Sequence, residues 1–138
     1  MPPTPSLGGA FNPRQGGVTL SGGGLGYAKG AGGAVTQATN RTTGVTIHKL
    51  CGTITTNNAS LAAEAAAKFT VTNNTVAIGD CIILTQQSGA VGVMTTVEVV
   101  AVANGSFDIS VMNGNVAAGT AETGAILINF AVIKAVST

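Results

Sequence analysis

Hydrophobic and polar residues alternate with a period of two along much of the chain from residue 34 onward. In residues 106–111, Phe, Ile and Val occupy the odd positions, while Ser, Asp and Ser occupy the even ones. The same alternation occurs in residues 68–72 and 45–48. This period indicates β-strands that have one buried and one exposed face.

Three longer runs are more continuously apolar, at residues 81–86, 94–102 and 125–134. Such runs are typical of central strands that are covered on both faces. Pairs of Asn, Asp, Ser and Gly separate the runs, and Asn104-Gly105 is the clearest hairpin signal. The pattern predicts eight strands, at residues 34–39, 43–48, 51–56, 66–73, 81–86, 94–102, 106–112 and 125–134. Short strands at this spacing predict an all-β sandwich or barrel.

Residues 61–67, with the sequence LAAEAAA, depart from this pattern because they have high helix propensity. Seven residues are too few for a helix that is stable unaided. We expect a loop here, with at most one helical turn, leading into the strand that begins near residue 66.

The composition changes sharply near residue 33. All four prolines lie within the first 13 residues, and 11 of the 20 glycines lie at or before Gly33. Such a segment cannot build a core of its own. We therefore expect a flexible Gly/Pro-rich arm over residues 1–33 and a β-sandwich domain over residues 34–138. The arm is either a disordered tail or a segment that becomes ordered against a neighbour. Its large side chains favour the second, and the candidate contacts are Leu7, Phe11, Arg14, Leu25 and Tyr27.

Charged residues make up only 8% of the chain, against roughly 25% in typical globular domains. The hydrophobic share is 45%, the mean hydropathy is +0.44 and the net charge is +1. A poorly charged surface promotes association, so we expect an oligomer. Neither the clustered Lys and Arg of a nucleic-acid site nor an apolar run that spans a membrane is present in the sequence.

Cys51 and Cys81 are the only cysteines, and their spacing fits no Cys-x-x-Cys site. Each lies beside apolar or β-branched residues, so we expect reduced and mostly buried side chains. A disulfide would form only if their two strands are neighbours.

Catalytic chemistry has little support in the sequence. The one histidine, His48, could join Asp80 or Asp108 in a triad, but no Ser lies in a Gly-x-Ser-x-Gly elbow. A zinc site would need His48, Cys51 and Cys81 to meet in the fold. We therefore predict no enzyme, no metal and no cofactor.

Two binding motifs are also weak. The glycine-rich residues 21–30 lack the third glycine of a dinucleotide loop and the Gly-Lys-Ser/Thr of a P-loop. A sugar platform would need exposed aromatic rings, but Phe69, Phe107 and Phe130 fall at predicted core positions. Only Phe11 and Tyr27 lie outside them, so glycan binding is possible but not indicated.

Several blocks, in this order and at this spacing, resemble a pattern in small bacteriophage virion structural proteins. They are residues 33–39 (GAVTQAT), 42–46 (TTGVT), Leu50, Gly52, Ile54, Thr55, 57–59 (NNA), 69–73 (FTVTN), 105–107 (GSF) and 128–134 (INFAVIK). The resemblance covers roughly residues 26–135 and includes neither cysteine. Proteins of this kind are capsid decoration (cement) or head-fibre proteins.

We therefore expect a single antiparallel β-sandwich, jelly-roll-like, that assembles as a homotrimer. The resemblance implies a decoration protein on the outer capsid surface of the virion, made in the host cytoplasm, with the major capsid protein as its partner. It would stabilise the head by bridging neighbouring capsid subunits. The alternative is a head-fibre or tail-fibre module that binds a host receptor or glycan. Neither nucleic acid nor membrane is an expected partner.

Overall fold

The computed structural model describes residues 11–12, 17–18 and 23–135. These residues form strands and loops, and none forms a helix long and apolar enough to cross a membrane. Two short strands in the N-terminal segment, β1 and β2, pair with each other. The strands are β1 (Phe11–Asn12), β2 (Gly17–Val18), β3 (Gly32–Thr36), β4 (Val45–Thr46), β5 (Cys51–Thr55), β6 (Ala66–Thr72), β7 (Cys81–Ser88), β8 (Thr95–Ala103), β9 (Ser106–Asn113) and β10 (Leu127–Ile133).

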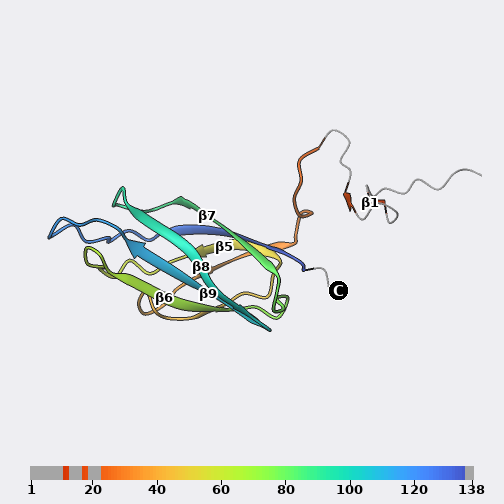
Figure 1. The fold of residues 1–138 in the computed structure, drawn as a ribbon, viewed down its shortest axis with the longest axis horizontal. Coiled ribbons are helices and arrows are strands. Elements are labelled where there is room, and N and C mark those ends of the chain that lie inside the picture. The colour runs from red at the N-terminus through yellow and green to blue at the C-terminus, as the bar shows by residue number, and fades with distance from the viewer. Residues whose placement is uncertain (1–10, 13–16, 19–22, 136–138) are drawn as a thin grey trace, which may run out of the picture.

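The last eight strands form two four-stranded sheets that pack as a sandwich (Figure 1). The strand order is β3-β5-β10-β7 in one sheet, here called the β10 sheet, and β4-β6-β9-β8 in the other, the β9 sheet. Each sheet is mixed, because β3 runs parallel to β5 and β4 runs parallel to β6. The prediction of a purely antiparallel sandwich is therefore wrong. The parallel partners are possible because the connections from β3 to β5 and from β4 to β6 are long enough for the chain to cross over and return to the same end of the sheet.

The core lies between the two sheets and uses the inward side chain of every second residue. Phe69, Phe107 and Phe130 are at most 3% exposed, as the alternation predicted. The rings of Phe107 on β9 and Phe130 on β10 lie 5.7 Å apart and join the two sheets. Buried aromatic pairs at this distance stabilise beyond the area that they bury.

All eight predicted strands are present, with ends shifted by a few residues. Two of the three predicted central strands, however, are edge strands. β10 lies between β5 and β7, whereas β7 and β8 each pair on one side only among the described strands. Their apolar runs therefore do not reflect coverage on both faces, and Ile83 and Val100 remain 46% exposed.

Local features match the sequence in two places. The Asn104-Gly105 pair turns β8 into β9, with φ of +82° at Gly105. The alanine-rich residues 61–67 form a turn and not a helix, because Leu61 bridges to Glu122 and Ala65 accepts a hydrogen bond from Asn113. The segment Gly23–Gly30 leaves the sandwich at the end where β10 finishes (Figure 1).

Candidate interaction surfaces

The side chains considered for catalysis do not converge. His48 lies just after β4, is exposed, and accepts a hydrogen bond through Nδ1 from the main-chain N–H of Asn74. Asp80 binds Lys134 and two main-chain N–H groups, while Asp108 binds Lys68 and Thr70. In the part of the chain that the structure describes, no three His, Cys, Asp or Glu side chains gather as metal ligands.

Cys51 and Cys81 are free thiols on the outer side of the β10 sheet. Cys51 pairs with Ala131 of β10, and Cys81 pairs with Ile133 on the other side of the same strand. With β10 between them, two strand spacings of about 4.8 Å keep the two Cα atoms beyond the reach of a disulfide. The expectation of mostly buried side chains is wrong, because Cys51 is half-buried and Cys81 is exposed.

The structure places three of the five candidate contacts in the N-terminal segment and gives the exposure of two of them. Leu25 is 80% exposed, and Tyr27 is 42% exposed with its hydroxyl donating to the carbonyl of Val132 on β10. Phe11 belongs to β1 and pairs with Val18. Leu7 and Arg14 lie outside the described residues. The described part of this segment thus presents a large apolar side chain to solvent, next to the end of β10.

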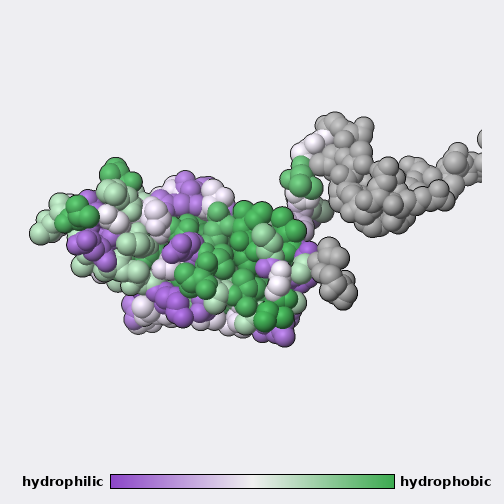
Figure 2. All heavy atoms as spheres, viewed as in Figure 1, coloured by the Kyte–Doolittle hydropathy of each residue, from purple (hydrophilic) through white to green (hydrophobic). Residues whose placement is uncertain are grey.

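A second apolar region lies where β8 begins and β9 ends. The loops at residues 89–94 and 114–121 expose four large hydrophobic side chains, and we call this group the apolar tip: Val91 (68%), Val93 (96%), Met94 (50%) and Val116 (74%). Hydrophobic atoms are visible at this end, opposite the N-terminal segment (Figure 2). A hollow of about 320 Å³ lies between the two loops, beside Val91 and Val93.

A buried carboxylate holds the apolar tip in place. Glu122 is 0% exposed, and its carboxylate accepts hydrogen bonds from the loop at residues 89–94, from the start of β8 and from Gly124. Burial opposes ionisation of Glu122, but these hydrogen bonds outweigh it and lower its pKa to about 2. The donors are the main-chain N–H groups of Val91 (2.9 Å), Gly92 (2.9 Å) and Gly124 (2.7 Å) and the hydroxyl of Thr95 (2.5 Å).

Arg41 holds the segment that follows the second of these loops, at residues 122–124. It is 3% exposed, and its guanidinium donates to the carbonyls of Glu122 (3.2 Å) and Gly124 (2.8 Å). Further hydrogen bonds reach Thr56 and Ala59. Gly114 also donates to the carbonyl of Met94 at 3.0 Å, which joins the two tip loops directly. Hydrogen bonds therefore hold the loops that carry the exposed valines. Loops with few such contacts are usually mobile.

The two sheets differ in charge on their outer sides. Lys68, Glu98 and Asp108 lie on β6, β8 and β9 of the β9 sheet. None of the four strands of the β10 sheet contains a charged residue. We call the outward side chains of β5, β7 and β10 the uncharged face: Cys51, Thr53, Thr55, Cys81, Ile83, Thr85, Leu127, Asn129, Ala131 and Ile133.

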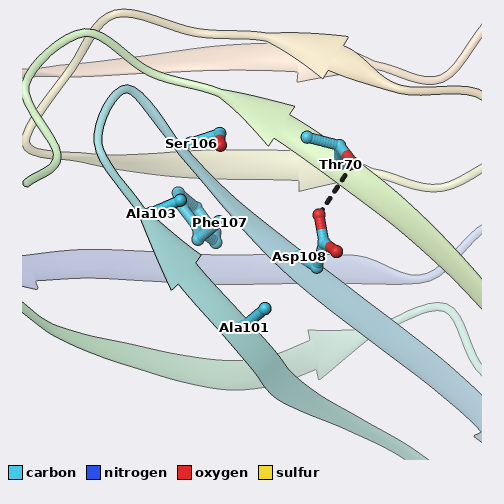
Figure 3. A pocket seen from close by; sticks show the side chains of 6 residues that line it. All are labelled: Thr70, Ala101, Ala103, Ser106, Phe107 and Asp108. Atoms are coloured by element: carbon cyan, nitrogen blue, oxygen red, sulfur yellow. Dashed lines mark hydrogen bonds between the residues drawn. The ribbon is translucent and has the colours of Figure 1, made fainter. Parts of the chain in front are cut away.

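A small hollow on the β9 sheet is a weaker candidate. It has a volume of about 170 Å³, below the roughly 300 Å³ of typical ligand pockets, and the buried ring of Phe107 contributes to its lining. Thr70 and Asp108 face each other across its wall, 2.7 Å apart (Figure 3). Hydrogen bonds from Thr70 and Lys68 lower the pKa of Asp108. The carboxylate is thus already paired and is a poor anchor for a ligand.

Sequence reasoning missed both the apolar tip and the uncharged face. The absence of charge within residues 32–36, 51–55, 81–88 and 127–133 is visible in the sequence, but only the strand order places these segments in one sheet. No sequence signal marked Glu122 as a buried anchor. No protein-family model, curated protein or solved structure matches this chain.

Proposed function

We propose that this chain is a bacteriophage capsid decoration (cement) protein, which binds the outer capsid surface as a homo-oligomer and stabilises the head. The apolar tip is the observation that carries the proposal. Four exposed hydrophobic side chains on a braced frame are unfavourable in water and favourable in a protein contact. The hollow beside Val93 suits an apolar side chain of the major capsid protein.

The shape of the molecule supports a bridging role. The apolar tip lies at one end of the long axis, and Leu25 lies in the segment that leaves the other end (Figure 1). Contacts at two opposite ends allow one molecule to join two neighbouring capsid subunits. The resemblance of the sequence blocks to small virion proteins points the same way, and the expected trimer, the extended arm and a jelly-roll-like strand order belong to this proposal.

Substitutions at the tip test the capsid contact. Particles of the encoding phage that lack this protein are mixed with purified chain, and bound chain is measured after sedimentation. Val93→Asp and Val116→Asp should abolish binding, because each places a carboxylate in an apolar contact. Ile78→Asp is the matched control, since Ile78 is 69% exposed but lies at the other end, bonded to Asn104. Equal binding of all three variants would refute the proposed contact.

The alternative is a head-fibre or tail-fibre module that binds a host receptor or glycan, which the small hollow at Asp108 supports only weakly. Removal of the protein separates the two functions. Loss of a cement protein should lower the temperature that particles survive and leave adsorption to cells unchanged. Loss of a receptor-binding fibre should abolish adsorption and leave heat resistance unchanged.

A further inference from the structure

Strand β7 is an edge strand with few of the features that usually protect an edge. It pairs with β10 along one side, and no described strand pairs with its other side. It is eight residues long, with the sequence CIILTQQS, and contains no charge and no proline. Natural proteins protect exposed edges with charged residues, proline, bulges or short strands, because free N–H and C=O groups can pair with another chain.

The other three edges of the sandwich have such features. β4 is only two residues long, and β3 has five residues, two of them glycine. β8 is long, but it carries Glu98 and its register shifts between Val99 and Ala101. β7 also shifts its register against β10 near its end, between Gln86 and Ser88, but its residues 81–86 pair regularly. Among the described edges, β7 alone is both long and uncharged.

The side chains beside this edge are apolar and exposed. Ile83 is 46% exposed and pairs with Ala131, while Ile133 is 48% exposed and pairs with Cys81. Figure 2 shows hydrophobic atoms over the part of β7 nearest the N-terminal segment. The edge therefore continues into the uncharged face without an intervening charge.

We propose that a second copy of this chain covers the β7 edge and the uncharged face beside it, an inference that rests on the homo-oligomer of the proposed function. A charged partner would bury its charges where the β10 sheet offers no counter-charge. The same surface of a second copy brings no charge and has free main-chain groups that can pair with those of β7. This contact has two-fold symmetry, so it forms dimers and differs from the three-fold contact of the proposed trimer. Self-association is thus the contact that leaves the fewest groups unsatisfied.

A matched pair of lysine substitutions tests this contact by sedimentation velocity over a range of protein concentrations. The wild-type chain should sediment as a multiple of 13.5 kDa. Thr85→Lys, on β7, should weaken association by roughly tenfold or more, because the lysine loses water and gains no counter-charge. Thr96→Lys is the control, since it makes the same change at an exposed position of β8 and should leave association unchanged.

The native thiol on β7 gives a second readout that needs no variant. Cys81 is exposed in one copy, so its alkylation should slow as the wild-type protein associates and should stay fast in Thr85→Lys. A wild-type chain that is monomeric at all concentrations, or an oligomer in which Cys81 reacts as fast as in a monomer, would overturn the inference. A monomer that still binds particles would contradict this inference and leave the capsid contact standing. An oligomer that binds no particles would contradict the capsid contact and leave this inference standing.

Discussion

Arg41 and Glu122 are both buried beside the same turn, yet the guanidinium of Arg41 donates to the main-chain carbonyl of Glu122, at 3.2 Å, and not to its carboxylate. The carboxylate is occupied by three main-chain N–H groups and the hydroxyl of Thr95. Each charged group therefore neutralises main-chain dipoles of the loops at one end of the sandwich. This arrangement explains how loops rich in Gly, Ala and Val can hold a fixed apolar surface.

Replacing Glu122 with Gln should destabilise the fold. The amide keeps one acceptor oxygen, but its NH₂ group then faces N–H donors that lose their partner. An unsatisfied buried donor costs about 1–3 kcal/mol, so we expect a loss of about 3 kcal/mol in the free energy of unfolding, measured with urea. Glu98→Gln is the control, because Glu98 is exposed on β8, and it should change stability by less than about 0.5 kcal/mol. Equal stability of the two variants would show that the network contributes nothing.

Stability should fall in acid. The hydrogen bonds described above lower the pKa of Glu122 from 4.5 to about 2, and those from Lys134, Ala135 and Ala77 lower the pKa of Asp80 from 3.8 to about 2. Below its ordinary pKa the unfolded chain binds protons that the folded chain does not, so folding is disfavoured as the pH drops. The free energy of unfolding should be constant above about pH 5 and should decrease between about pH 4.5 and about pH 2.

Urea unfolding at a series of pH values measures this dependence. Glu122→Gln should remove part of the acid-dependent loss, since that variant has no proton to take up at residue 122. An unfolding midpoint that is the same at about pH 3 as at neutral pH would contradict the assigned protonation states.

Two glycines with similar backbone angles should respond differently to alanine. Gly89 has φ of +89° and Gly119 has φ of +84°, a conformation that costs an alanine about 1 kcal/mol. A Cβ at Gly119 meets nothing within 4 Å, whereas a Cβ at Gly89 would collide with the carbonyl of Ala125. Gly89→Ala should therefore lower the melting temperature clearly more than Gly119→Ala. A smaller or equal effect at Gly89 would mean that Gly89 does not lie against the main chain of Ala125.

The local pattern predicted the strands well but predicted their neighbours poorly. Alternation, together with three continuously apolar runs, gave all eight strands of the sandwich, because buried positions leave a direct trace in the sequence. The same pattern could not distinguish an edge strand of a sheet from a central strand. β7 contains Ile82, Ile83 and Leu84 although it is an edge strand, and the outward Ile83 is left uncovered in a single copy. Parallel pairing of β3 with β5 likewise depends on the path of the chain and not on local residues.

The candidate surfaces were harder to predict, for a physical reason. The residues considered for chemistry were chosen by type, and the structure scatters them. The apolar tip consists of common valines and one methionine, whose importance lies in their exposure alone. Exposure is a property of the assembled sandwich, so it could not be inferred from residues 89–94 and 114–121 before the loops were placed. The arm residues remain a prediction from composition.

Both cysteines should titrate as free thiols. Cys51 and Cys81 lie on opposite sides of β10, too far apart for a bond within one chain. Titration of the denatured protein without reductant should therefore detect two thiols per chain. Finding none, with a monomer mass that reduction does not change, would mean an internal disulfide and a strand order different from the one described.

Removing residues 1–25 should separate folding from attachment. Among the described residues, all fifteen buried hydrophobic side chains of the core lie at or after Val45, and the deletion keeps Tyr27 with its bond to Val132. The truncated chain should therefore unfold at the same temperature as the full chain. It loses Leu7, Phe11, Arg14 and Leu25, so its binding to particles that lack the protein should weaken if the arm ties neighbouring subunits together.

Leu25→Ser is the point variant that tests the one exposed leucine of the described segment, and it should weaken binding less than the deletion does. Unchanged occupancy after deletion, with the tip variants still defective, would show that the arm is a passive tail and that the apolar tip alone makes the capsid contact.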